Sequence, residues 1–257
     1  TTSSTSPVGI IETTSNTQSS GELYAHNSEW ISLARTSSGQ PAGFEIGDVQ
    51  YREMALDIQN STLSGINSIN AAQGIHGFGG YYGKWDSKFN IQNNTISHIR
   101  GNSLPPNSGV RFSDICMTTG VQDSKVLNNV VSGCAVGVFF IGSGYQNYYP
   151  SGTSGMPDFG LVEGNEFIDI EYLDVWFYFS ESRDSVVRDN TFSGSSLPGY
   201  NVYIQDSSSF FSTKTSGLVV DGNTFSNGEY PIYSRYGVDW TITDNVINGN
   251  GDASFPG

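Results

Sequence analysis

The chain has 257 residues, enough for one large β domain, and it carries 11 basic and 25 acidic residues for a formal net charge of −14. This balance argues against nucleic acid as a partner, because phosphate binding needs clustered Lys and Arg. No apolar run approaches the roughly 20 residues of a membrane-spanning helix, so no membrane insertion is expected. Only 14% of the residues are charged, as is common in exported proteins. We therefore expect an extracellular or cell-surface protein.

The first 54 residues are expected to form an N-terminal segment and capping region, followed by a repeat domain at 55–257. The opening stretch, "TTSSTSPVGIIETTSNTQSSG", lacks the basic and apolar parts of a signal peptide, as a processed or engineered start would. The two cysteines, Cys116 and Cys134, have two possible states. They could pair as a disulfide, or stay as two separate buried thiols.

Residues 55–250 repeat a pattern in which an Asn has an apolar residue three positions before it and another two positions after it. Two copies are "VVRDNTFSG" (186–194) and "VVDGNTFSN" (219–227). The Asn of the pattern is Asn94, Asn129, Asn165, Asn190, Asn223 and Asn245, and Ser61 takes its place in an earlier copy. The copies are 22 to 36 residues apart. This spacing predicts an all-β fold, a single-stranded right-handed parallel β-helix of about seven coils with loop insertions.

The repeated Asn has a structural role in such a solenoid. At a tight bend between strands it can adopt left-handed dihedrals, and its amide can hydrogen-bond to the Asn of the next coil. The repeat resembles that of the pectate-lyase-like family of right-handed β-helices, which includes polysaccharide lyases, glycosidases, epimerases and adhesins. Ahead of it, "GELYAHNSEWISLAR" (21–35) looks like the "LY…W…LAR" segment of some bacterial secreted β-helix proteins, although "TSSGQP" replaces their Arg-Tyr-Pro-type turn.

A second strand column is predicted between the Asn turns. Its stretches are "GIHGFG" (74–79), "GVRFSD" (109–114), "GVFFIG" (137–142), "DVWFYF" (174–179), "NVYIQD" (201–206) and "PIYSRY" (231–236). Because side chains alternate along a strand, the third residue of each stretch should point outward. These outward residues are His76, Arg111, Phe139, Trp176, Tyr203 and Tyr233. Two positions further along, the outward residues include Tyr178 and Arg235.

The aromatic file from Phe139 to Tyr233 predicts a binding strip for a linear polysaccharide, because sugars stack flat C–H faces on aromatic rings. Tyr178 and Arg235 would add hydrogen-bonding groups. Two alternatives stay open: inserted loops, above all residues 143–158, could cover this face, or another subunit could contact it. The chain has 11 Lys and Arg, few for an enzyme that acts on pectate or alginate, so a neutral or weakly charged glycan is the more natural ligand.

Two pairs of residues are candidates for catalysis. His76 and Arg111 fall on consecutive coils, where a lyase could use His76 as base and Arg111 to neutralise a carboxylate. Tyr203 would be the proton donor, but it stands three coils from Arg111. Glu181 and Asp206 could supply the two carboxylates of a glycosidase. For each pair the alternative is a structural role, as a rim histidine or as solvated turn residues.

The stretch "EFIDIEYLDV" (166–175) is rich in acidic residues. Alternation would place Asp169 and Glu171 on one face, where Ca²⁺ could bind; no other cofactor is indicated, and simple exposure is the alternative.

The sequence thus favours a carbohydrate-active enzyme, a lyase or a glycosidase, or else a non-catalytic glycan-binding or adhesion module. The chain stops right after a repeat, at "DNVINGNGDASFPG", with no amphipathic helix over the last coil. A shortened chain or a subunit that associates end to end would account for this.

Overall fold

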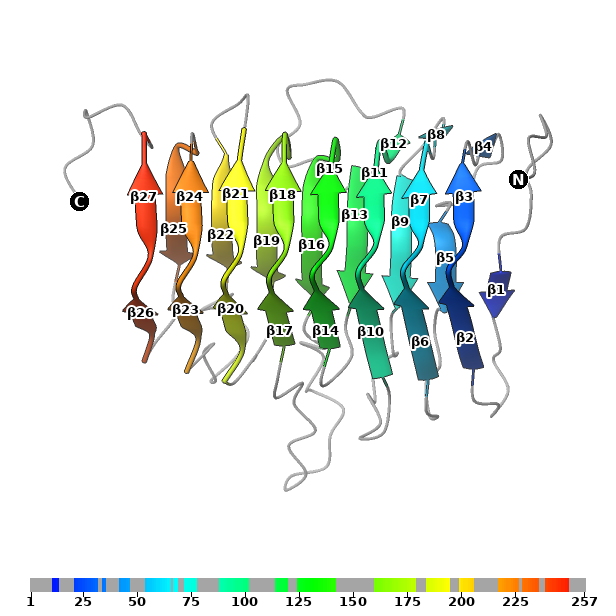
Figure 1. Cartoon of the computed structure of the whole chain (residues 1–257), viewed down its shortest axis with the longest axis horizontal. Coiled ribbons are helices and arrows are strands. Elements are labelled where there is room, and N and C mark those ends of the chain that lie inside the picture. The colour runs from blue at the N-terminus through cyan, green and yellow to red at the C-terminus, as the bar shows by residue number, and fades with distance from the viewer. Residues whose placement is uncertain are drawn as a thin grey trace.

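The chain winds into a right-handed parallel β-helix, a rod in which each strand lies beside its counterpart from the next coil (Figure 1). The computed structural model describes residues 11–13, 21–31, 34–35, 42–46, 54–65, 67–68, 72–77, 88–101, 114–119, 124–141, 160–178, 184–194, 199–205, 217–226, 228–235 and 239–249. Within these ranges there is no helix, and so no helix long and apolar enough to cross a membrane. The predicted all-β parallel β-helix is confirmed, with eight strands in each of its three long sheets.

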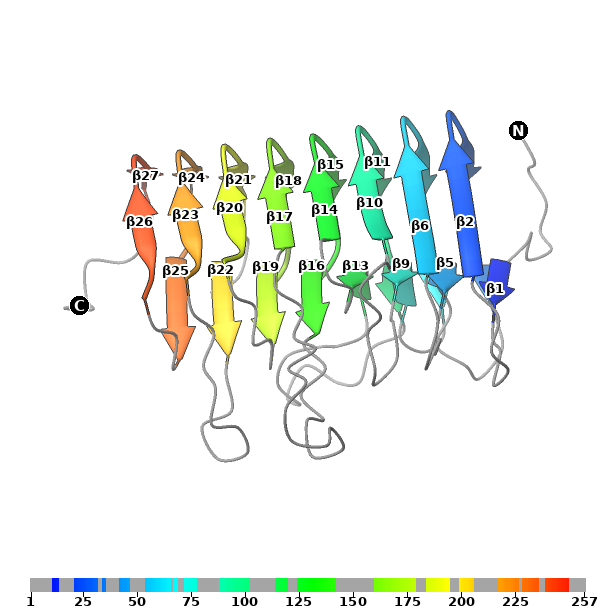
Figure 2. The same cartoon turned by 90° about the horizontal axis from the view of Figure 1, so that it is seen from below.

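Four parallel sheets make up the rod. Sheet A contains β1 (Ile11–Thr13), β5 (Ala42–Ile46), β9 (Ala72–Gly77), β13 (Asp114–Thr119), β16 (Val136–Ile141), β19 (Leu173–Tyr178), β22 (Tyr200–Gln205) and β25 (Tyr230–Arg235). Sheet B contains β2 (Gly21–His26), β6 (Met54–Gln59), β10 (Lys88–Gln92), β14 (Ser124–Leu127), β17 (Gly160–Glu163), β20 (Val186–Arg188), β23 (Val219–Asp221) and β26 (Thr241–Thr243). Sheet C contains β3 (Glu29–Ile31), β7 (Thr62–Ser64), β11 (Thr95–Ser97), β15 (Val130–Ser132), β18 (Glu166–Ile168), β21 (Thr191–Ser193), β24 (Thr224–Ser226) and β27 (Val246–Asn248). Sheet D contains β4 (Ala34–Arg35), β8 (Asn67–Ser68) and β12 (Arg100–Gly101). Figure 2 shows β1 and β2 at one end of the rod and β26 and β27 at the other.

The predicted Asn column forms a buried ladder at the corner between sheets B and C. Asn165 shows the pattern: its Nδ2 donates to the Val126 carbonyl at 2.8 Å and to Asn190 Oδ1 at 3.0 Å. Its Oδ1 accepts from the backbone N–H and from Nδ2 of Asn129, both at 2.9 Å. The same bonds join consecutive ladder residues from Asn94 to Asn245. Each coil therefore satisfies the buried amide of its neighbour.

The left-handed residue at this corner is the one before the ladder Asn, which corrects the expectation that the ladder Asn itself takes this conformation. The residues concerned have φ between 51° and 66°; they are Asn27, Asn60, Asn93, Asn128, Gly164, Asp189, Gly222 and Asp244. There is a physical reason why the turn and the ladder hydrogen bonds fall to two different residues. The ladder Asn must direct its own N–H at the Oδ1 of the next coil, so the preceding residue makes the turn.

The predicted N-terminal cap is part of the β-helix wherever it is described. β2, β3, β4 and β5 pair in parallel with β6, β7, β8 and β9, as a coil does. Leu23 and Ala25 are buried in the same core as Leu56. The Asn pattern is missing here because Ser28 holds the ladder position, where its N–H donates to Ser61 Oγ at 3.1 Å.

The interior is filled by columns of identical or similar side chains. In sheet C, Phe167, Phe192 and Phe225 are in register and stack with ring centroids 5.1 and 4.9 Å apart. All three are fully buried, as expected for the apolar residue two positions after each Asn. Because identical side chains stack on one another, each coil packs against the next in the same way, and further coils can be added to the rod.

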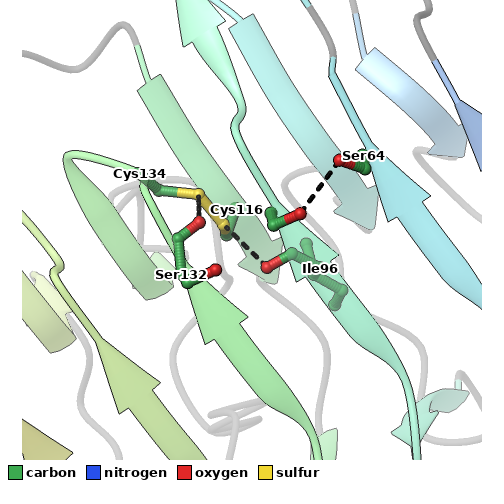
Figure 3. Close-up of a disulfide and its surroundings, with 6 residues drawn as sticks. Ser64, Ile96, Cys116, Ser132 and Cys134 are labelled. Atoms are coloured by element: carbon green, nitrogen blue, oxygen red, sulfur yellow. Dashed lines mark hydrogen bonds between the residues drawn. A yellow bond between two sulfur atoms is a disulfide. The ribbon is translucent and has the colours of Figure 1, made fainter.

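Cys116 in β13 and Cys134, just before β16, form a disulfide in the core (Figure 3). Their Cα atoms are 5.9 Å apart and the two residues are separated by 18 positions. The sulfur of Cys116 lies 4.0 Å from the Ile96 carbonyl oxygen, and that of Cys134 lies 3.5 Å from the Ser132 carbonyl oxygen. Of the two states that the sequence allowed, the structure has the disulfide.

Candidate functional site

The outer face of sheet A carries a second apolar cluster, separate from the core. Val138 and Phe140 point into the core, so Phe139 between them points outward. The buried members of the outer cluster are Ile115, Val136, Phe139, Leu173 and Trp176. Tyr172, Tyr200 and Tyr203 pack against it and are only partly buried. An apolar cluster on the outside of a sheet marks this face as a place where something other than the core is bound or covered.

A break in the alternation of side chains in β13, β16, β19 and β22, here called the bend of sheet A, explains how this face is built. Cys116 and Met117 are consecutive residues, yet both belong to the core cluster. With two successive residues turned inward, the residues on either side of them both face outward, three positions apart. Val136 and Phe139 are related in this way, and so are Tyr200 and Tyr203. The outer face therefore has two columns of side chains in place of one.

The aromatic file predicted from the sequence is in register, but it is not exposed along its whole length. Phe139 pairs with Trp176, Trp176 with Tyr203, and Tyr203 with Tyr233. Phe139 and Trp176 are only 3% and 1% exposed, so a glycan has no access to their rings in this structure. These two residues are therefore covered, and residues 143–158, the cover expected in one of the alternatives, lie outside the described residues. Tyr233, by contrast, is 37% exposed.

Four tyrosines form the accessible part of this face: Tyr200, Tyr203, Tyr230 and Tyr233, here called the tyrosine platform. Tyr203 and Tyr233 stack with ring centroids 5.3 Å apart, and Tyr200 and Tyr230 stack at 4.9 Å. The two stacks touch, because the rings of Tyr200 and Tyr203 are 4.8 Å apart. Tyr233 belongs to β25, the last described strand of sheet A, so one of its faces packs on Tyr203 while no described strand follows on the other side.

A carboxylate adjoins the tyrosine platform. Loss of solvation raises the pKa of the Tyr230 phenol, and a hydrogen bond to Glu229 raises it further. Burial likewise raises the pKa of Tyr200, with added contributions from Tyr233 and Glu229. The phenols of Tyr200 and Tyr230 are therefore neutral at physiological pH. Tyr230 gives its O–H to Glu229, so its phenol oxygen and the rest of the carboxylate can accept hydrogen bonds from a ligand.

Sequence reasoning found Tyr203 and Tyr233 but missed Tyr200, Tyr230 and Glu229. The signal was present: "YNVY" at 200–203 recurs as "YPIY" at 230–233. Strict alternation hid it, because alternation places residues three apart on opposite faces of a strand. The bend in sheet A is what brings them to the same face.

Comparison with known families agrees with this architecture. Residues 115–255, more than half of the chain, match the model of the right-handed β-helix region family. The chain belongs to this family. No curated protein and no solved structure matches it. The family fixes the fold of this β-helix, and its chemistry has to be argued from the surface.

The strand register assumed for the predicted catalytic pair His76 and Arg111 differs from the one in the structure, and the pair itself stays a prediction. The strand of that coil is β13 (Asp114–Thr119) and not 109–114, so the neighbour of His76 across the sheet is Thr118. The register moves because Met117, in place of Val110, supplies the inward residue between Ile75 and Val138. Arg111 itself lies outside the described residues, and nothing is described of the His76 side chain.

The remaining polar candidates are placed by their strands alone. Glu181 and Asp206 lie outside the described residues, so their separation stays a prediction. Tyr178 and Arg235 are in register with Gln205, which lies between them on β22. Tyr178 and Arg235, predicted to share a column, thus do so in the backbone register.

The predicted calcium ligands Asp169 and Glu171 are not on a strand, which removes the alternation that was to place them on one face. β18 ends at Ile168, and Asp169 is an exposed turn residue with φ of 50°. The Asp169 carboxylate lies against Gly194 of the next coil. The two are so close that a Cβ atom added to Gly194, whose φ is 79°, would be only 2.4 Å from Asp169 Oδ1. Among the described residues, no three His, Cys, Asp or Glu side chains gather so as to hold a metal ion.

The last described coil exposes apolar side chains. Ile242, Val246 and Ile247 are each at least half exposed. Such a surface is what end-to-end association of coils would use, and association itself stays a prediction.

Proposed function

We propose that this β-helix binds a neutral, linear polysaccharide at the tyrosine platform, outside the cell. The observation that carries the proposal is the platform itself, four mutually stacked tyrosines at the accessible end of the outer face of sheet A. The exposed ring of Tyr233 offers an apolar face to a sugar ring, while the neutral phenols and Glu229 offer hydrogen bonds to its hydroxyls.

Charge and redox state support the remaining parts of the proposal. A net charge of −14 disfavours anionic polymers, which leaves neutral glycans as the better match. The buried disulfide supports an extracellular location, because disulfides form and persist in oxidising compartments. We prefer binding to catalysis because stacked aromatic rings are what the platform supplies, and these suit contact with the face of a sugar.

Depletion by insoluble polymers tests the proposal. The full chain is mixed with cellulose, chitin or mannan as neutral polymers, and with calcium-alginate beads as the anionic one, and the protein left in solution is measured. We expect binding to at least one neutral polymer and none to alginate. Tyr233→Ala should weaken binding by about tenfold, because one aromatic face is lost from the contact.

The matched control is Val246→Ala, which removes an exposed apolar side chain from the same end of the rod without touching the platform. Equal losses in the two variants would mean that general hydrophobicity, and not the tyrosine platform, drives adsorption. New reducing ends or an unsaturated product in the supernatant would show that the bound polymer is also cleaved.

A further inference from the structure

The outer face of sheet B near the N-terminal end holds a second cluster of chemistry-bearing residues, which the tyrosine platform does not use. Its members, here called the N-terminal patch, are Tyr24, His26, Asp57, Gln59 and Asn90. They occupy three adjacent strands: Tyr24, Asp57 and Asn90 are in register across β2, β6 and β10, and His26 is in register with Gln59. The alternate residues of these strands, among them Leu23 and Leu56, are buried in the core, so the patch faces outward.

Asp57 organises the patch. Its Oδ1 accepts hydrogen bonds from Gln59 Nε2 and from Asn90 Nδ2, both at 2.8 Å. Its Oδ2 lies 3.3 Å from His26 Nε2. Three polar side chains from three strands are thus fixed around one carboxylate on a rigid sheet, which reduces the conformational entropy that a ligand would have to remove on binding.

The groups left over after these bonds determine the ligand that fits. Gln59 and Asn90 each use one N–H on Asp57, which leaves the second N–H of each amide as a donor and its carbonyl oxygen as an acceptor. His26 directs Nε2 at Asp57, so its Nδ1 is turned away from the carboxylate. A surface with amide donors and acceptors around one carboxylate suits a ligand that brings many hydroxyls, which both donate and accept, and no negative charge.

Tyr24 adds an apolar face to these donors and acceptors. It is 58% exposed, and its ring is edge-on to His26 with centroids 6.4 Å apart. An exposed aromatic ring beside pre-ordered planar polar groups matches the two sides of a sugar, which has an apolar C–H face and a rim of hydroxyls.

We infer that the N-terminal patch is a second binding site for a neutral sugar chain, with Tyr24 as the stacking residue and the groups around Asp57 as donors and acceptors for its hydroxyls. This inference extends the proposed function and rests on it for the ligand class. The two sites lie on different sheets and near opposite ends of the rod, β2 to β10 against β22 and β25 (Figure 2). One chain can therefore hold two glycan chains, or two distant parts of one, and gain avidity from doing so.

Titration calorimetry with soluble oligosaccharides separates the two sites. Cellohexaose, chitohexaose and mannohexaose are titrated in turn into the full chain and into its variants. We expect two molecules of the bound hexasaccharide per chain in the unchanged protein and one in Tyr24→Ala, with the affinity of the lost site reduced at least about tenfold. Asp57→Leu, which removes the group that orders the patch, should abolish the same site.

The control is Thr241→Ala, an exposed position in the same column of sheet B at the far end of the rod, which should keep both sites. Two sites retained in Tyr24→Ala would overturn the N-terminal patch and leave the tyrosine platform standing. A single site that is lost in Tyr24→Ala and kept in Tyr233→Ala would support the patch and overturn the proposed function. No binding of any of the three hexasaccharides by the unchanged protein would overturn the assignment of the patch to neutral sugars.

Discussion

Buried polar residues occur both in the Asn ladder and in a column at the bend of sheet A, and the two columns differ in how completely their hydrogen bonds are satisfied. In the Asn ladder, each amide receives and donates bonds to the same residue type in the neighbouring coils. The other column lies at the bend of sheet A, where successive coils place Cys116, Gly137, Asp174 and Asn201. There Asn201 Nδ2 donates to Asp174 Oδ2, but Asn201 Oδ1 has no hydrogen-bond partner among the described residues.

The difference shows what repetition contributes to a solenoid. A polar position that is the same in every coil is satisfied by its own copies, whereas a position that changes from coil to coil needs a separate solution each time. At the bend of sheet A those solutions are a disulfide, a glycine and a buried acid. Burial raises the pKa of Asp174 to about 8, so this residue is largely protonated at neutral pH.

The largest effect is expected from Asp174→Asn, and it should depend on pH. The pKa of Asp174 is about 8 in the folded chain, against 3.8 for an aspartate that is free in water. Between pH 3.8 and about 8, Asp174 is ionised in the unfolded chain and protonated in the folded chain, so the free energy of unfolding falls as the pH rises. Below pH 3.8 this residue does not destabilise the fold, and above about pH 8 its destabilisation no longer changes with pH. We expect the free energy of unfolding to fall by on the order of 5 kcal/mol between pH 4 and pH 9 through this group.

Asp174→Asn imitates the protonated acid and should remove that dependence. Urea unfolding at pH 5 and at pH 9 measures it: the variant should gain stability over the unchanged chain chiefly at pH 9. Parallel pH profiles of the two proteins would mean that Asp174 finds a stabilising partner for its charge.

The next largest effect is expected in the ladder. Asn165→Ala removes the acceptor of two Asn129 donors and the donor to the Val126 carbonyl, all in the buried core. Buried polar groups left without partners cost about 1–3 kcal/mol each, so we expect a loss of about 4 kcal/mol in the free energy of unfolding.

Asn245→Ala is the matched control for the ladder. It removes the same amide, but Asn245 is only partly buried and lies in the last described coil, where water can replace the lost bonds. Guanidinium unfolding should show a loss of about 1 kcal/mol for this variant. If both variants lost the same amount, burial would not be what makes the ladder stabilising.

Positions that repeat in every coil could be predicted from the sequence, whereas positions that change from coil to coil could not. The ladder, the core phenylalanines and the register from Phe139 to Tyr233 follow from a repeated pattern, and these predictions are confirmed. The first coil was not recognised because Ser28 holds the ladder position there in place of Asn. The strand at 114–119 was misplaced because two apolar stretches, ending at Phe112 and at Met117, compete for one place in the register.

The surface was less predictable than the core, and for a physical reason. Whether an outward residue such as Trp176 is exposed depends on what covers it, and alternation along a strand carries no information about that. The N-terminal patch was missed because its five residues come from three coils and show no common motif. Only the register between β2, β6 and β10 brings them together.

The smallest of the three stability effects is expected from the disulfide, which closes the irregular column at Cys116. Replacing both cysteines, Cys116→Ala with Cys134→Ala, frees a loop of 18 residues in the unfolded chain and should cost about 3 kcal/mol. Guanidinium unfolding at pH 5, where the contribution of Asp174 is small, isolates this term. The unfolded chain without the cross-link exposes more surface, so the denaturant dependence should become steeper as the midpoint falls. A lower unfolding midpoint with an unchanged denaturant dependence would mean that the lost stability comes from packing around Ile96 and Ser132 in the folded chain. The two sulfur atoms would then stabilise the bend of sheet A by filling space more than by cross-linking the chain.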